Sequence, residues 1–448
     1  MSKYDTYKET DVIWFKELPA HWKRKRVKDV TQTLAGGTPD TSKEEYWEGS
    51  IPWLPSGKVQ NSIINEEDAD TFITEEGLKN SATKMLPAPA TLIALTGATC
   101  SNIGYLTFDA CANQSVVGMP GSSKILPKFL FYTLQSQKEQ ILLHQTGGAQ
   151  GGISESDVKF LFIPVPIESE QLTIANYLDD QTQKIDRLIA NKKAQAEKLK
   201  ELRQIEINNA VTKGLNPNVE MKDSGIEWLG KIPKHWTTKR MKDVASVRGR
   251  IGFRGYTVDD IVDEGALVIG AKHINSSNQL NFDDPEYISW EKYYESPEIM
   301  VEVGDVLIVQ RGSVGKFALV EKEIGPATIN PSMILLRLNT RIHPQFLFWY
   351  LLGEHMFNII KTIVSSTAVP MISQMQAGVF RIILPPKKEQ IEIANYLMER
   401  TAAIDQLIKN IEAQIEKLQE LRKIKIYEAV TGKICLNQDF QDARINRI

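Results

Sequence analysis

Two glycine-rich turns in the second half of the chain carry arginine and lysine at close spacing. The first reads Val-Arg-Gly-Arg-Ile-Gly-Phe-Arg-Gly and holds Arg248, Arg250 and Arg254; the second reads Gln-Arg-Gly-Ser-Val-Gly-Lys and holds Arg311 and Lys316. Guanidinium and ammonium groups on loops reach phosphate oxygens, and arginine can also donate two parallel hydrogen bonds to a base edge. These residue types predict a surface that binds anions or nucleic acid.

Two glycine-rich turns in the first half are neutral. The first holds Gly36, Gly37 and Thr38, and the second holds Thr96 before Gly97. Such loops offer backbone amides and hydroxyl groups to phosphates or bases. We therefore include them among the candidate nucleic-acid contacts.

One basic position recurs in both halves, as Lys58 and Lys272. We predict that both lysines anchor phosphates, because phosphate contacts require only a positive charge or a donor. His273, the neighbour of Lys272, completes the set of candidate contacts. A surface lysine or arginine is more often simply solvated, so each position is a hypothesis on its own.

The motifs of several enzyme classes are absent from the sequence. The nearest approach to the Asn-Pro-Pro-aromatic motif of amino-methyltransferases is Asn330-Pro331-Ser332-Met333, which lacks the second proline and the aromatic residue. Lys316 follows glycines at the wrong spacing for a phosphate-binding loop and precedes Phe317 instead of serine or threonine. A nuclease would need clustered carboxylates, and Ser56 stands where one is expected before Lys58. We predict a non-catalytic chain.

The chain repeats itself. Residues 13–30 and 227–244 match at an offset of 214, including the pairs Trp14 with Trp228 and His21-Trp22 with His235-Trp236, and the run Ile-Ala-Asn-Tyr-Leu at 174–178 returns at 393–397. The matches continue between these ends, so two whole modules are repeated and not one short motif. A molecule with two such modules is expected to be pseudo-twofold and to read something that itself has two halves.

Each module has a globular part followed by a helical part. Short β-prone runs such as 90–95 and 304–309 lie between turns rich in Gly, Pro, Asn and Ser, which predicts β-rich, α+β globular domains. We expect the first globular domain over 1–165, a central helix over 166–215, the second globular domain over 216–386, and a C-terminal helix and tail over 387–448. The fold class is therefore α+β.

The two helical segments predict an antiparallel coiled coil within the chain. Neither Pro nor Gly occurs between 168 and 211 or between 389 and 430, and apolar residues recur at heptad-like spacing. Lys192 in the first segment corresponds to Ile411 in the second, an asymmetry that favours pairing within one chain. The expected seam consists of Leu178, Ile185, Leu188, Leu199 and Leu202 with Leu397, Ile404, Leu407, Ile411, Leu418 and Leu421.

With these residues the chain resembles the specificity subunits of type I restriction-modification systems. The resemblance rests on Trp-Leu-Gly-Lys-Ile-Pro-Lys-His-Trp at 228–236 with its twin at 14–22, and on Gly-Gly-Thr-Pro at 36–39. Glu-Gln-x-x-Ile-Ala-Asn-Tyr-Leu at 170–178 and 389–397 completes it. It extends over essentially the whole chain.

The resemblance implies two target-recognition domains held apart by the paired helices, each reading one half of an interrupted sequence in double-stranded DNA. It also implies docking of two methylation subunits and, in the restricting complex, two restriction subunits. S-adenosylmethionine, ATP and Mg²⁺ would then serve those partners, and this chain would hold no cofactor. The different loops of the two halves indicate different half-sites. Two alternatives stay open: a nuclease or DNA methyltransferase with an unrecognised site, and a protein-only scaffold.

Composition agrees with a soluble globular protein. The chain has 448 residues, 42% apolar and 24% charged, with a net charge of −3, so any nucleic-acid surface must come from local basic clusters. No apolar run is long enough for a membrane span, and the N-terminal residues do not form a secretory signal. The cysteines at 100, 111 and 435 are few and not spaced for a metal, which predicts the cytoplasm.

Several features have two interpretations at this point. The basic run Lys23–Lys28 either grips DNA, faces solvent or faces a partner subunit, and the glycines of 147–152 either wrap phosphate or form a hinge. We expect His21 and His235 to be structural. The repeated tryptophans Trp14, Trp22, Trp228 and Trp236 are expected to be core or interdomain anchors.

Overall fold

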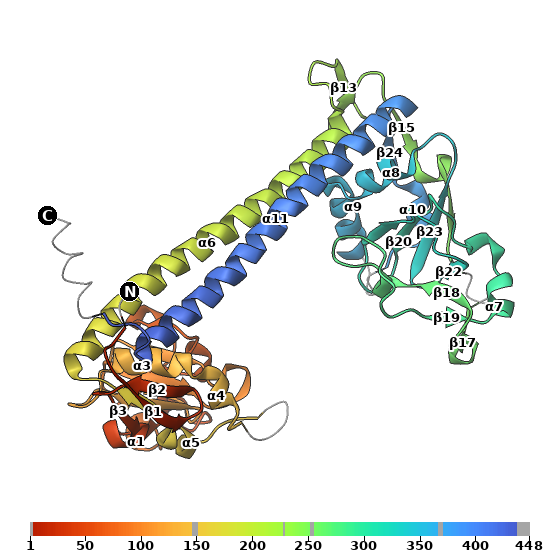
Figure 1. Cartoon of the computed structure of the whole chain (residues 1–448). Coiled ribbons are helices and arrows are strands. Elements are labelled where there is room, and N and C mark those ends of the chain that lie inside the picture. Colours follow the sequence, from red (N-terminus) through yellow and green to blue (C-terminus); the bar gives the residue numbers. More distant parts are fainter. Residues whose placement is uncertain (1–2, 146–150, 227–228, 251–254, 366–370, 437–448) are drawn as a thin grey trace. The chain divides into compact units, whose positions relative to one another are not determined.

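The computed structural model describes residues 3–145, 151–226, 229–250, 255–365 and 371–436 (Figure 1). By their internal contacts these residues form two compact units. Unit 1 consists of residues 1–192 with 413–448, and unit 2 consists of residues 193–412. Each unit therefore holds one globular part and a segment of both long helices.

Unit 1 contains a five-stranded sheet of order β4-β11-β8-β9-β6 and a three-stranded sheet of order β10-β5-β7. Two antiparallel pairs, β1-β2 and β12-β3, complete its β structure. The strands are β1 Tyr7–Val12, β2 Phe15–Pro19, β3 Lys23–Arg26, β4 Leu34–Ala35, β5 Trp47–Leu54, β6 Ile63–Ile64, β7 Phe72–Ile73, β8 Ala90–Ala94, β9 Ile103–Leu106, β10 Cys111–Ala112, β11 Val116–Pro120 and β12 Phe162–Val165. The short helices are α1 Val27–Val30, α2 Glu75–Lys79, α3 Pro127–Ser136, α4 Lys138–Leu142 and α5 Glu155–Phe160.

Unit 2 contains four-stranded sheets of order β16-β23-β20-β21 and β17-β19-β18-β22, with the antiparallel pairs β13-β14 and β15-β24. The strands are β13 Met221–Asp223, β14 Lys231–Pro233, β15 Thr237–Arg240, β16 Ala245–Arg248, β17 Ile261–Val262, β18 Ala266–Ile269, β19 Tyr287–Ile288, β20 Val306–Val309, β21 Phe317–Leu319, β22 Ala327–Ile329, β23 Met333–Leu338 and β24 Arg381–Leu384. The short helices are α7 Trp290–Tyr294, α8 Pro344–Leu351, α9 Glu354–Ser365 and α10 Gln374–Val379.

The two units use the same strand order. In the larger sheet of unit 1, β4-β11-β8-β9 corresponds to β16-β23-β20-β21 in unit 2, and the parallel pair β10-β5 corresponds to β22-β18. The predicted β-prone runs at 90–95 and 304–309 form the central strands β8 and β20. The expected α+β class and the internal repeat are confirmed.

The long helices are α6, Glu168–Lys213, and α11, Lys387–Val430. Within unit 1, Arg422 Nε of α11 lies 2.9 Å from Asp186 Oδ1 of α6; within unit 2, Arg203 Nε of α6 lies 2.9 Å from Asp405 Oδ1 of α11. The residue numbers of each pair add up to 608, so both pairs belong to one antiparallel register. The predicted antiparallel coiled coil within the chain is confirmed.

Both helices contribute to the hydrophobic core of each unit. In unit 1, Ile174 and Leu178 at the start of α6 pack in one cluster with Ile426 and Val430 at the end of α11. In unit 2, the end of α6 and the start of α11 supply the corresponding residues, which are Ile207, Ala210, Val211, Ile393, Ala394 and Leu397. Burial of these apolar side chains is the main stabilising contribution to both helix ends.

The expected seam of the coiled coil was partly wrong. Leu178, Ile185, Leu397 and Ile404 are buried as expected. A two-helix contact covers only a narrow stripe of each helix, and other residues of that stripe, such as Ala196 and Ile408, take the remaining buried positions. The apolar residues that were expected in the seam but are exposed are Leu188, Leu202, Leu407 and Leu421.

A buried glutamine fixes the start of each long helix to the globular part of its unit. Gln171 accepts from the Leu126 amide at 2.8 Å and donates to the carbonyls of Lys124 and Pro166, both at 3.0 Å. Gln390 does the same in unit 2, where it bonds to His343, Arg341 and Pro385. The repeated Glu-Gln motif is thus a structural connection in each unit.

No helix among the described residues is both long and apolar enough to cross a membrane.

We predict that Gln171→Ala lowers the free energy of unfolding by about 1–3 kcal/mol, because it leaves buried backbone groups without a partner. Urea denaturation of the full chain measures this change. Gln195→Ala, at an exposed position of the same helix, is the matched control and is expected to alter stability by less than about 0.5 kcal/mol. Equal effects of the two substitutions would contradict the role assigned to Gln171.

Candidate nucleic-acid interface

An asparagine turn organises the loops at one end of the larger sheet of unit 1. This Asn113 turn (residues 113–115) precedes β11, and the Asn113 amide donates to the Leu54 carbonyl at 3.0 Å. The Leu95 amide donates to the Ser115 carbonyl at 2.8 Å, and Asn113 Oδ1 accepts from the Ser115 amide. The loops that carry Lys58 and Thr96 therefore begin beside the same turn.

Unit 2 repeats this arrangement around the Asn330 turn (residues 330–332), which precedes β23. The Asn330 amide donates to the Ile269 carbonyl at 3.0 Å, and the Gln310 amide donates to the Ser332 carbonyl at 2.8 Å. The loops that carry Lys272 and Arg311 thus start at the Asn330 turn. Each unit has one such strand-end face: residues 36–38, 55–58, 96–97 and 113–115 in unit 1, and residues 248–250, 270–272, 310–312 and 330–332 in unit 2.

Thr96 and Arg311 occupy equivalent places on the two faces. Thr96 forms an isolated bridge with Gly152, and Arg311 forms one with Met371, in both cases just before the short helix α5 or α10. Thr96 is exposed and its hydroxyl donates to Ser115 Oγ at 2.8 Å. The repeat therefore places a hydroxyl on one face where the other has an exposed cation.

Lys58 and Lys272 form matching ion pairs. Lys58 Nζ lies 2.6 Å from Asp70 Oδ2, and Lys272 Nζ lies 2.9 Å from Asp284 Oδ2, with a spacing of 12 residues in both. Lys58 holds the pKa of Asp70 below its usual value, and Lys272 does the same for Asp284. The carboxylates orient the two ammonium groups and reduce their net charge, so phosphate anchoring by either lysine would have to compete with its acid.

Two of the predicted contact residues are internal. Arg250 is 6% exposed and donates from Nε to the Ile329 carbonyl at 3.1 Å and from Nη2 to Thr328 Oγ1 at 3.1 Å. His273 is 2% exposed; its Nδ1 accepts from the Gly270 amide at 2.9 Å, and burial lowers its pKa. These positions disfavour DNA contact because both side chains already have protein partners.

Of the other predicted cations, Arg248 and Arg311 are exposed, at the ends of neighbouring segments on either side of β23. Lys316 is half-buried and donates to the Ile274 carbonyl at 3.1 Å. Arg254 lies outside the described residues. The structure therefore brings Arg248 and Arg311 to one face as its accessible positive charges. Lys316 differs because it is already bound to a backbone carbonyl.

The glycines of the first neutral turn serve packing. The Gly36 amide donates to the Val116 carbonyl at 3.0 Å and the Gly37 amide to the Ala112 carbonyl at 2.8 Å. A Cβ at Gly36 would lie 2.2 Å from the Asn113 carbonyl oxygen, and one at Gly37 would lie 2.4 Å from a backbone nitrogen. These two amides are therefore not available to a ligand. Thr38 is half-buried, and its hydroxyl donates to Gln114 Oε1.

The Asn-Gln-Ser run at 113–115 and the Asn-Pro-Ser run at 330–332 were not among the contact residues predicted from the sequence. Their position in the structure makes them the centre of each face. The available signal was their recurrence with Asn and Ser in the same places, flanked by β-prone runs. Among the described residues, no three His, Cys, Asp or Glu side chains gather as possible metal ligands.

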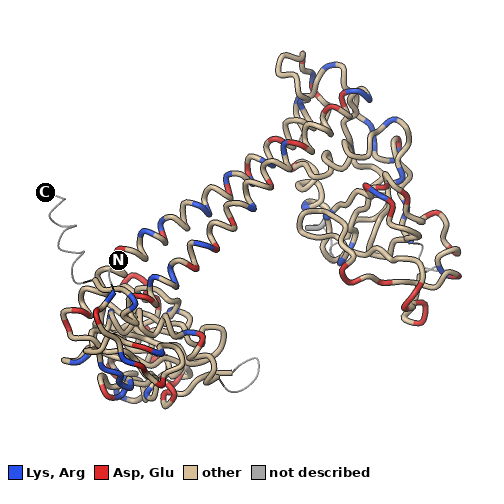
Figure 2. Tube along the Cα trace, in the orientation of Figure 1, with Lys and Arg blue, Asp and Glu red and all other residues tan. Residues whose placement is uncertain are grey.

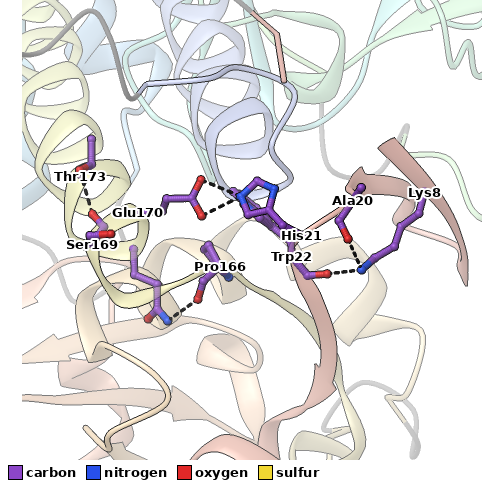
Figure 3. A network of polar contacts seen from close by, with 9 residues as sticks. Lys8, Ala20, His21, Trp22, Pro166, Ser169, Glu170 and Thr173 are labelled. Carbon is purple, nitrogen blue, oxygen red and sulfur yellow. Dashed lines mark hydrogen bonds and ion pairs between the residues drawn. The ribbon is translucent and has the colours of Figure 1, made fainter. Parts of the chain in front are cut away.

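The repeated histidines lie far from these turns along the chain, and each contacts a glutamate at the start of a long helix. His21 Nε2 lies 3.1 Å from both carboxylate oxygens of the buried Glu170 (Figure 3). His235 Nε2 lies 2.6 Å from Glu389, whose other oxygen accepts from Trp236 Nε1 at 2.8 Å. Each histidine thus connects a β-hairpin to a helix start, in agreement with a structural role.

The repeated tryptophans agree with the expected role as anchors. Trp14, Trp22 and Trp236 are buried in the cores of their units. Trp228 lies outside the described residues.

Comparison with known proteins gives the same repeat. The family model described as the type I restriction modification DNA specificity domain matches residues 19–198 and again residues 233–417. The specificity subunit of the type I restriction enzyme MjaVIII from Methanocaldococcus jannaschii is 24% identical over 450 residues, which cover 96% of this chain and 97% of that protein. The EcoR124I/EcoR124II specificity subunit from Escherichia coli is 26% identical over half of each chain.

Solved structures have the same fold. A chain from a study of complex assembly and conformational transition of the type I R-M system has a TM-score of 0.72 at 16% identity and covers 93% of this chain and 99% of its own. The HsdS subunit from Thermoanaerobacter tengcongensis has a TM-score of 0.51 at 16% identity, covering 93% and 98%. Because the family model matches most of the sequence in two copies, the chain belongs to the type I restriction-modification DNA specificity family.

Proposed function

We propose that this chain is the DNA-recognition subunit of a type I restriction-modification complex and that each unit reads one half of an interrupted duplex target through its strand-end face. The observation that carries this proposal is the repetition of one loop arrangement, around the Asn113 and Asn330 turns, with different side chains in the two copies. Arg248 and Arg311 give unit 2 donors suited to guanine or phosphate, and Thr38 and Thr96 give unit 1 neutral hydrogen-bonding groups.

We further propose that the division into two target-recognition domains, 1–165 and 216–386, with helical parts 166–215 and 387–448, is also the functional division. The chain itself is non-catalytic in this proposal and acts in the cytoplasm. S-adenosylmethionine, ATP and Mg²⁺ serve the partner subunits.

Two matched apolar surfaces on the helices support the docking of two methylation subunits. In unit 1, Leu188 of α6 and Leu421 of α11 are exposed; in unit 2, Leu407 of α11 and Leu202 of α6 are exposed in the matching positions, with an offset of 219. The pairs Leu172 with Ile391 and Ile205 with Ile424 are exposed in the same way. Exposed apolar surface repeated in equivalent places is typical of equivalent protein contacts. In the restricting complex we place two restriction subunits beside the methylation subunits.

The DNA-reading role predicts that Arg311→Ala weakens binding of the target duplex. If Arg311 reads a base, the binding free energy should weaken by about 1–3 kcal/mol and the base preference in one half-site should relax. If Arg311 contacts phosphate, the slope of log binding constant against log salt concentration should be smaller by about 1. Binding titrations at several salt concentrations measure both quantities. Arg341→Ala removes an exposed arginine beyond the opposite end of β23 and is expected to change neither; equal losses for both variants would contradict the role of the face.

Docking of two equivalent partners predicts that Leu188→Ser with Leu421→Ser releases one methylation subunit from the complex. Each leucine that is buried in the complex contributes about 2 kcal/mol of binding free energy. Because both leucines are exposed in the free chain, we expect the substitutions to leave its fold intact. Native mass spectrometry of the assembled complex measures the stoichiometry. Leu202→Ser with Leu407→Ser should release one subunit as well, and retention of both subunits by either variant would contradict the proposed docking surfaces.

A recognition subunit, as opposed to an enzyme, is expected to show no turnover on its own. The purified chain should neither cleave nor methylate DNA with Mg²⁺ and S-adenosylmethionine, and methylation should appear when methylation subunits are added. Turnover by the chain alone would contradict the proposal, and absence of DNA binding by the assembled complex would favour a protein-only scaffold.

A further inference from the structure

The densest basic run of the chain forms an open strand of unit 1. Lys23–Arg26 is strand β3, and Lys28 lies in the short helix α1 that follows. In the described part of the chain β3 pairs with β12 alone, and three of its four side chains are exposed. Figure 2 shows Lys and Arg gathered around β3 and α1. We name this surface the β3 face, defined by residues 23–28.

Two phenylalanines hold the arginines of the β3 face in place. The guanidinium carbon of Arg24 lies 4.7 Å from the ring centroid of Phe162, and that of Arg26 lies 5.2 Å from the same ring. Lys28 Nζ lies 4.0 Å from the ring centroid of Phe160, which is itself 48% exposed. Cation–π contacts of this kind orient cations without neutralising them.

Few acids compensate these charges. Asp11 pairs with Arg24, and the Asp29 carboxylate accepts from the Arg26 backbone amide. A hollow between β1 and β3 is lined by Lys8, Glu9, Thr10, Asp11, Lys23, Arg24 and Lys25. Lys8 is engaged with the carbonyls of Ala20 and Trp22 (Figure 3). The β3 face therefore keeps an excess of positive charge on a chain whose net charge is negative.

Unit 2 shows that the fold does not require the first two cations of this run, although it keeps Lys239 and Arg240 at the places of Lys25 and Arg26. Its equivalent strand β15 has Thr237 and Thr238 where unit 1 has Lys23 and Arg24, and it pairs with β24 in the same antiparallel manner as β3 pairs with β12. The phenylalanines have no counterpart either, because Val379 and Arg381 take their places. Lys23 and Arg24 add like-charge repulsion that the threonines of the sister strand do not, which indicates a ligand of opposite charge.

The β3 face lies at the far end of α5 from the strand-end face of unit 1. Helix α5 begins after the bridge between Thr96 and Gly152 and ends at Phe160, beside β3. The Thr33 hydroxyl donates to Glu155 at 2.5 Å and connects α5 to the segment between β3 and β4. Six helical residues span about 9 Å, which is about three base pairs of duplex at 3.4 Å each.

From this geometry we infer that the β3 face binds the phosphate backbone of duplex DNA just outside the half-site read by unit 1, independently of sequence. It rests on the proposed function in taking DNA as the ligand. The contact adds more affinity on this side of the target than β15 adds in unit 2, since β15 has two cations fewer than β3. The affinity for random-sequence DNA then depends on residues of the β3 face, which take no part in reading the target.

The test replaces the two cations with the residues of the sister strand. Lys23→Thr with Arg24→Thr, in the full chain with its methylation subunits, should lower the log–log salt slope for a random-sequence duplex by about 1–2 and weaken binding roughly 8- to 60-fold at 0.1 M salt, from a slope of about 0.9 per phosphate. The lower value applies if Asp11 keeps its pairing with Arg24. Lys409→Gln with Lys417→Gln, at exposed positions of α11, removes the same charge elsewhere and should leave the slope unchanged. The reciprocal exchange Thr237→Lys with Thr238→Arg should raise the slope.

An unchanged slope in Lys23→Thr with Arg24→Thr, or equal losses in the α11 control, would overturn the inference. Loss of a methylation subunit with an unchanged DNA slope would also overturn it and would assign the β3 face to a protein contact. Failure of the proposed function is distinguishable, because the wild-type complex would then not prefer its target over the random duplex.

Discussion

The antiparallel register of α6 and α11 is the constraint on which the rest of the structure depends. Arg422 with Asp186 and Arg203 with Asp405 are the same ion pair formed twice, and each lies within its own unit. Exposed ion pairs contribute little free energy by themselves. The larger contribution comes from the cores, since each is completed by the start of one helix and the end of the other. A register shift would withdraw apolar side chains from both cores at once.

This constraint leaves the loops of the globular parts free to differ. The strand order, the buried glutamine at each helix start and the asparagine turn before β11 or β23 are the same in both units. The side chains displayed around those turns are not. A face with Thr38 and Thr96 on one unit and a face with Arg248 and Arg311 on the other, each on the same framework, are suited to reading two different half-sites. The shared backbone arrangement positions the loops, and the side chains on those loops differ between the two units.

Much of the fold could be predicted from the sequence because its main signals are long or duplicated. Two segments of more than 40 residues lack Pro and Gly, and the β-prone runs recur at a fixed offset. Each signal is therefore observed twice in the sequence. The seam was harder: Leu188 and Leu407 fit a heptad as well as buried residues do, and only packing decides which face is covered. Arg250 and His273 looked like surface cations because burial is a property of the tertiary structure. Gly36 and Gly37 looked like ligand-binding amides for the same reason, but in the structure they donate to the carbonyls of Val116 in β11 and Ala112 in β10.

The central proposal is that two units on one chain read separate halves of one DNA sequence. Genome-wide sequencing of methylated adenines in cells that contain the complete system tests it most directly. The account predicts a motif with two specified parts, different in sequence, separated by unspecified positions of constant number. A continuous motif or a gap of variable length would contradict it. So would the finding that every methylated motif persists when this chain is deleted.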